Sequence, residues 1–208
     1  HNELSHIQKI SRLNNNNYVW LDKFTIANLE LVYSPHPNGS TLLSVLNHTK
    51  SNMGARRLQR WIVLPLVDRK EIEKRQDIVS YFVKEDIIAE NIRNSVKNIG
   101  DLERMVAKAA YGRIMPNELV QLKNVLQEID KIKSLCNGID ALRMQERLDI
   151  CQDLIDNISK TLNQDSPNSV SKGNVIASGV DSELDELREL SYNGKDYRLK
   201  LQQRETEN

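Results

Sequence analysis

Apolar residues recur at three- and four-residue intervals along most of this chain, and this spacing predicts an all-α fold. Residues 18–25 differ, because they mix β-branched and aromatic side chains and could form a short extended stretch. Residues 26–33 return to helical spacing. The clearest stripe follows Pro116 and requires a partner helix, because its members share one helical face: Leu119, Leu122, Leu126 and Ile129.

Capping residues set the expected helix boundaries. A short helix is expected after Ser40 or Thr41, and a second one from about Met53 to Leu64, where Pro65 ends it. Further helices are expected to begin at polar residues or at a proline: Asp68 with Glu71 as its capping-box partner, Asp86, Asp101 and Pro116.

The last third of the chain changes in character. Residues 163–174 are polar and predict a linker. A charged helix is expected from about Asp181, with an apolar stripe of Leu184, Leu187 and Leu201. Polar residues and a glycine interrupt this stripe, so the helix cannot bury much surface on its own.

Charge and composition limit the possible functions. Lys plus Arg and Asp plus Glu both number 29, so the chain lacks the basic excess of a stand-alone DNA-binding protein. Cys136 and Cys151 have no partner His cluster, which indicates a reduced compartment. The sequence has no apolar run of roughly 18 residues and no signal-peptide layout, which predicts a soluble, cytoplasmic protein without a membrane partner.

Catalytic and metal-binding motifs are absent from the sequence. The one Gly-Lys pair, Gly194-Lys195, has Glu189 where a phosphate loop requires glycine. No His or Cys spacing suits a metal, and no nucleophile stands beside a base. The sequence therefore predicts that this chain is not an enzyme and holds no cofactor or metal.

Six short motifs follow one another along the chain: Leu21-Asp22-x-x-Thr25-x-x-Asn28-Leu29-Glu30-Leu31; Thr49-x-x-x-Met53-Gly54-x-Arg56-x-Leu58-x-x-Trp61-x-x-x-Pro65-Leu66; Arg75-x-x-x-Val79; Asp101-Leu102-Glu103-Arg104; Gly112-Arg113-x-x-Pro116-x-Glu118-Leu119; and Gly179-x-Asp181-x-Glu183-Leu184-Asp185-x-Leu187-Arg188. In this order they resemble the core domain of MutS-type DNA mismatch repair proteins. Asn47 and Ser51 replace the family's usual Asp and Thr, but both keep an oxygen that can cap a turn.

The resemblance implies a helical core domain with a long lever helix at its C-terminal end. Residues 1–17 would be the tail of a connector domain, 18–162 the first half of the core, 163–180 a linker, and 181–208 the start of the lever helix leading to a DNA clamp. The family's Phe-x-Glu mismatch wedge is missing, because Ile26 follows Phe24 and Lys84 follows Phe82 at that spacing. The clamp and the ATPase domain are missing too, so the resemblance implies a fragment.

Two sets of residues are candidates for special roles. The structural signature of the resemblance comprises Met53, Gly54, Arg56, Trp61, Pro65, Asp101, Arg104 and Arg113. Within it, a Met53-Gly54 turn and Trp61 as a core anchor would fix the base of the lever. Candidates for DNA-backbone contact lie on the last helix: Lys195, Arg198, Lys200 and Arg204.

A basic cluster in the first half of the chain allows two interpretations. Arg56, Arg57 and Arg60, with Lys50 nearby, could contact phosphate. A solvated helix face with salt bridges between helices explains them more simply. For Asp101 to Arg104, a helix cap plus an i,i+3 ion pair is likewise simpler than an allosteric contact.

The function that the resemblance implies is a non-catalytic core and lever segment that couples a DNA clamp to a distant ATPase domain. Its expected partners in the full-length protein are mismatched duplex DNA, a second copy and a downstream mismatch repair factor, with ATP and Mg as cofactors and a nucleoid-associated location. One alternative is a helical coiled-coil scaffold with no nucleic-acid role. A recombination-type member of the same superfamily is another, although the motif at 21–31 favours the repair branch.

Overall fold

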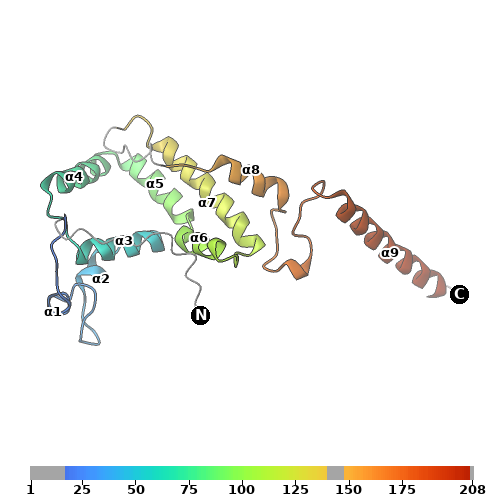
Figure 1. Ribbon diagram of the computed structural model, residues 1–208, viewed down its shortest axis with the longest axis horizontal. Helices are drawn as coiled ribbons and strands as arrows, with labels where there is room; N and C mark the ends of the chain where they lie inside the picture. The colour runs from blue at the N-terminus through green and yellow to red at the C-terminus, as the bar shows by residue number, and fades with distance from the viewer. Residues whose placement is uncertain (1–16, 140–147, 207–208) are drawn as a thin grey trace. The chain divides into compact units, whose positions relative to one another are not determined.

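The computed structural model describes residues 17–139 and 148–206, with side chains up to position 194. Within these ranges the chain is all-α, as predicted, and extended pairing is limited to the isolated bridges Tyr18–Leu66 and Leu162–Ile176. The elements, labelled in Figure 1, are α1 (Lys23–Asn28), α2 (Leu42–Leu46), α3 (Asn52–Val63), α4 (Arg69–Lys84), α5 (Asp86–Asn98), α6 (Leu102–Ala110), α7 (Pro116–Leu135), α8 (Gln152–Thr161), the 3-10 turn η3 (Val170–Lys172) and α9 (Ser182–Thr206).

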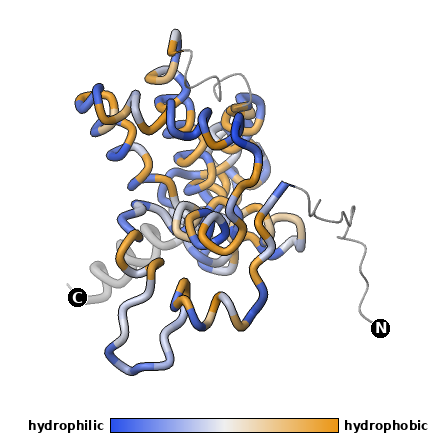
Figure 2. The backbone as a smooth tube through the Cα atoms, turned by 90° about the vertical axis from the view of Figure 1, so that its left-hand side faces the viewer, coloured by the Kyte–Doolittle hydropathy of each residue, from blue (hydrophilic) through white to orange (hydrophobic). Residues whose placement is uncertain are grey.

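The chain forms two compact units. The first comprises His1–Ile114 and Gln121–Gln152, and the second comprises Met115–Val120 and Asp153–Asn208. Orange apolar and blue polar stretches alternate along the helices in Figure 2, as expected of amphipathic helices. Whether residues 163–180 separate a core from a lever remains a prediction.

The helix starts of the first unit follow the predicted caps. Thr41 and Ser44 form a reciprocal capping box at α2, and Ser51 accepts a hydrogen bond from the Gly54 N–H at the start of α3. Asp68 caps α4 through the Lys70 N–H, but Glu71 pairs with Lys74 and does not complete the expected capping box. These caps depend on side chains within three residues, which explains why the sequence shows them.

The first helix was predicted at the wrong residues. Helix α1 begins at Lys23, because the Asp22 carboxylate accepts a hydrogen bond of 2.7 Å from the Thr25 N–H. Residues 29–33 are not helical. Glu30 has a φ of 47°, and the Leu31 N–H reaches back to the Ile26 carbonyl, which is the hydrogen bond that closes a helix C-terminus.

The core of the first unit forms around α7. Leu122, Val125 and Leu126 of α7 are buried, as is Met105 of α6. A Cβ built on Gly100 would lie 3.6 Å from Met105 Cε and 3.9 Å from Val125 Cγ2, so both side chains lie beside the turn before α6. Of the predicted α7 stripe, Leu122 and Leu126 are confirmed in the core, whereas Leu119 and Ile129 are half-buried.

The second unit contains a closed loop where a linker was predicted. The Asn163 amide donates to the carbonyl oxygens of Asn174 and Ile176, at 3.0 and 3.1 Å. Ser166 is buried, and its hydroxyl donates to the Asn163 carbonyl at 2.6 Å. Polar side chains in this segment therefore satisfy backbone groups of the same segment, and composition alone does not distinguish that arrangement from a solvated linker.

Replacing Ser166 with alanine should lower the free energy of unfolding of the second unit by about 1–3 kcal/mol, because buried carbonyl groups lose their donor. Ser159→Ala is the matched control, since Ser159 is exposed on α8. Hydrogen exchange across residues 162–177 provides the measurement. Equal exchange in the two variants would show that the Ser166 hydroxyl does not hold the loop.

Candidate functional site

The described residues contain no group of three or more His, Cys, Asp or Glu side chains able to hold a metal ion. Among the same residues, no helix is long and apolar enough to cross a membrane. The candidate site is the segment from Thr41 to Leu66, which contains the second motif of the resemblance, together with the α6 residues that it contacts.

Gly54 lies where α3 begins. Helix α3 starts at Asn52, so Met53 and Gly54 belong to its first turn and do not form the predicted turn between helices. A Cβ on Gly54 would lie 3.1 Å from Ser51 Oγ and 3.4 Å from Thr49 Cβ. A larger residue would displace the Ser51 cap, which gives a physical reason for glycine at this position.

Arg56 joins α3 to the start of α6. Its Nη1 and Nη2 donate to the two Asp101 carboxylate oxygens at 2.9 and 2.7 Å, and its Nε donates to Glu103 at 2.9 Å. This fork geometry makes a bidentate Arg–carboxylate pair stronger and more directional than a single ion pair. Arg56 and Asp101, which are 45 residues apart in sequence, therefore join the two helices.

Asp101 has two partners. Besides Arg56, its Oδ1 accepts a hydrogen bond of 3.4 Å from the Arg104 N–H and caps α6, which confirms the predicted cap. The closest ion pair of Asp101 is with Arg56, at 2.7 Å, a partner that the sequence did not predict. The hydrogen bond from Arg56 is the main reason that the pKa of Asp101 lies below its usual value, and the charge of Arg104 three positions on also lowers this pKa. The hydrogen bonds of Arg56 to Asp101 and Glu103 raise the pKa of Arg56 above its usual value.

The structure divides the predicted basic cluster. Arg56 is engaged between helices, which favours the salt-bridge interpretation over a phosphate patch for this residue. Arg57 and Arg60 are exposed on α3. Lys50 and Lys97 line a polar hollow of about 380 Å³, but Asp101 lines it too, so the hollow is not uniformly cationic.

Trp61 is not the predicted core anchor. Its side chain is 40% exposed. The Arg75 guanidinium lies 4.0 Å from the centroid of its ring, and the Arg57 guanidinium 5.6 Å. The electron-rich ring face attracts these cations, so the Trp stacks with arginines at the surface. Leu58 and Ile62, both half-buried, take the inward positions of α3.

Two further signature residues mark the ends of helices. Pro65 is half-buried directly after α3, at the predicted stop. Arg113 is exposed between α6 and α7, where its N–H donates to the Lys108 carbonyl at 2.8 Å. The candidates for DNA-backbone contact lie in α9, but their side chains are outside the described residues: Lys195, Arg198, Lys200 and Arg204.

Sequence reasoning assigned no role to Glu103 or Arg75. Glu103 stands two positions after the cap residue, and nothing local indicates that its partner lies on α3. The sequence shows that Arg75 shares a helical face with Ile72 and Val79. Its contact with Trp61 depends on how α3 and α4 pack against each other, which the sequence does not show.

Comparison with known proteins identifies the family. A family model described as MutS domain III matches residues 24–207. The chain is 48% identical over 210 aligned positions to the DNA mismatch repair protein MutS of Phocaeicola vulgatus, 47% identical to that of Bacteroides fragilis and 45% identical to that of Porphyromonas gingivalis. Each match covers 100% of this chain and 24% of the relative, so the chain spans about a quarter of the length of these curated relatives.

This chain belongs to the MutS domain III family. MutS domain III is a non-catalytic core domain, and the ATPase domain of the full-length proteins lies outside the region that this chain matches. The prediction that the chain itself is not an enzyme agrees with that assignment.

Proposed function

We propose that this chain is the core and lever segment of a DNA mismatch repair protein, in which it couples a DNA clamp to a distant ATPase domain. The main observation in support is α9, a continuous helix over Ser182–Thr206. At about 1.5 Å per residue, its 25 residues extend roughly 37 Å. Its Leu187 and Leu190 are 57% and 68% exposed, so the described part of the helix is largely solvated.

The start of α9 is fastened to the closed loop before it. Asp181 caps the helix through the Leu184 N–H at 3.0 Å. Asp185 accepts a hydrogen bond of 2.6 Å from the Gly179 N–H, which is the main reason for its lowered pKa. Arg188 donates to the Ile176 carbonyl at 2.9 Å. A long helix anchored at one end moves nearly as a unit, so a small rotation at its base displaces the far end by a larger distance.

The activity of the full-length protein is proposed from the proteins that this chain resembles. In the full-length context the proposed partners are mismatched duplex DNA, a second copy and a downstream repair factor, with ATP and Mg bound by the ATPase domain. Lys195, Arg198, Lys200 and Arg204 are proposed to contact the DNA backbone where α9 approaches the clamp. A cytoplasmic, nucleoid-associated location is part of the same proposal.

A proline at Leu187 of the full-length protein tests the lever. Leu187→Pro removes a backbone donor and kinks α9, at a local cost of about 3 kcal/mol or more. We expect mismatch binding and ATP turnover to persist separately, while stimulation of ATP turnover by mismatched DNA is lost.

Leu187→Ala is the control, because it removes the same exposed side chain but leaves the helix intact. The two measurements are ATP turnover with and without mismatched duplex, and the affinity for that duplex. Normal stimulation in the proline variant, with a kink verified by structure determination, would exclude transmission through α9.

A further inference from the structure

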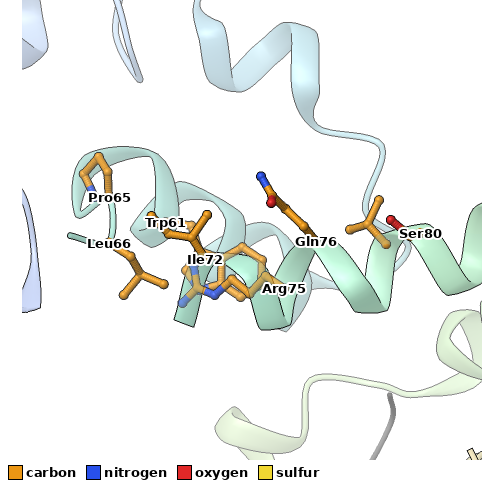
Figure 3. Close-up of a pocket in the computed structure, with 8 residues that line it drawn as sticks. Trp61, Pro65, Leu66, Ile72, Arg75, Gln76 and Ser80 are labelled. Atoms are coloured by element: carbon orange, nitrogen blue, oxygen red, sulfur yellow. The ribbon is translucent and has the colours of Figure 1, made fainter. Parts of the chain in front are cut away.

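A groove runs between the end of α3 and one face of α4. It has a volume of about 640 Å³, and Figure 3 shows its lining side chains at the end of α3, in the segment that follows and along α4. Most of the lining is apolar and comes from Trp61, Pro65, Leu66, Ile72 and Val79, and the polar lining residues are Arg75, Gln76 and Ser80. Val79 is 60% exposed in this groove, so a large apolar side chain of α4 lacks full cover in the described structure.

Helical spacing keeps the carboxylates of α4 out of the groove. Ile72, Arg75 and Val79 are three and four residues apart and share one face. Glu71 and Glu73 lie toward the sides of the helix, where they pair with Lys74 and Arg69. None of the described residues that line the groove is acidic, so the charge of its lining is positive.

Arg75 provides the charged group of the groove. Its guanidinium is stacked on Trp61 at 4.0 Å, and its side chain is half-buried. Over the described residues, no hydrogen bond or ion pair uses its N–H donors. Stacking occupies the flat face of a guanidinium and leaves its edge free, so these donors are held ready for a planar acceptor such as a carboxylate.

We propose that this groove binds an acidic amphipathic helix of a partner protein. Apolar side chains one turn apart on the partner would pack on Trp61, Ile72 and Val79, and a carboxylate on the same face would pair with Arg75. The positive charge of Arg75 favours an acidic partner. The apolar side chains that form most of the lining favour a peptide over the phosphate backbone of a nucleic acid. A groove along a helix is a common receptor for an amphipathic helix. This interaction does not depend on the lever function.

Peptide selection on the full-length protein that contains this chain tests the proposal. A random peptide library displayed on phage is selected on the wild-type protein, and enriched peptides are then synthesised with a fluorescent label. We expect sequences with apolar residues at i and i+3 or i+4 and with an Asp or Glu on the same face. Fluorescence anisotropy should show binding about tenfold weaker to Arg75→Glu, because the charge-assisted pair becomes a repulsion.

Lys70→Glu is the matched control, since it makes the same charge change on α4 away from the groove and should leave binding unchanged. Replacing the peptide's carboxylate by Lys should restore part of the affinity for Arg75→Glu. If that variant does not fold by circular dichroism, Arg75→Gln removes the charge alone and is expected to weaken binding in the same direction.

Several results would overturn the proposal. Selected peptides that are basic or that lack acidic residues would do so, as would equal binding to the wild type and both Arg75 variants. Displacement of a bound acidic peptide by a single-stranded oligonucleotide, with the oligonucleotide binding more tightly, would assign the Trp61–Arg75 stack to nucleic acid instead.

Discussion

Leu126→Ala is expected to lower the free energy of unfolding of the first unit by about 2–5 kcal/mol. Leu126 is only 6% exposed and lies on the α7 face that also buries Leu122 and Val125. Truncation removes the transfer free energy of the side chain and leaves a cavity that close-packed neighbours fill only in part. A loss of this size is a large fraction of the stability of an ordinary domain.

Urea denaturation followed by circular dichroism and by Trp fluorescence measures this loss. The fluorescence reports on the first unit, because Trp20 and Trp61 both belong to it. Ile87→Ala is the control, since Ile87 on α5 is 78% exposed and its truncation should change stability by less than about 0.5 kcal/mol. Similar losses in the two variants would mean that α7 is not the centre of the core.

The second large effect is expected at Asp101. Asp101→Ala removes the α6 cap and one of the two carboxylate partners of Arg56 in one step, so it should destabilise the first unit more than Arg56→Ala, which leaves the cap in place. Asp101→Asn separates the two roles, because Asn is a good capping residue but carries no charge for the Arg56 fork. The expected order of stability is wild type, then Asp101→Asn, then Asp101→Ala.

The pH dependence of this difference has a definite sign. The folded-state pKa of Asp101 is lowered, mainly by Arg56, so its stabilising contribution is present above its unfolded pKa of about 3.9. The contribution is lost as the pH falls through the lower folded pKa. The advantage of the wild type over Asp101→Asn should therefore be constant near neutral pH and disappear in acid.

Unfolding free energies measured across this acid range, at low and at high salt, check the pH prediction. Arg56 is partly exposed, so added salt should reduce the advantage. An advantage that persisted below the folded pKa would show that hydrogen bonding without charge accounts for the contact. Residual acid sensitivity in the Asn variant is expected, because the pKa values of Asp22 and Glu128, which belong to the same unit, are also lowered.

The sequence predicted those parts of this fold that depend on neighbouring residues. Thr41, Asp68 and Asp101 cap helices as expected, because each acceptor and its N–H lie within a few positions. The end of α1 was missed because it depends on the left-handed backbone at Glu30, a conformation that non-glycine residues seldom adopt.

Contacts between distant residues were the other source of error. The spacing of Trp61 on α3 suited a core position, and only the packing of α4 beside it shows that Arg75 stacks on the ring. Arg56 was recognised as part of a basic cluster, yet its partners lie 45 and 47 residues away. Charge composition does not show which residues pair at that separation, so the contacts of the site required the structure, whereas most helix starts did not.

The two attachments at the start of α9 also determine how this helix can turn. A helix held at a single point can swivel about its own axis. Asp185 and Arg188 are one turn apart, and both bind the same short stretch, at Gly179 and Ile176. This double attachment resists rotation of the helix about its own axis. The loop therefore fixes both the position at which α9 begins and its orientation about that axis. It thereby determines which side chains of the helix face any structure that meets its far end.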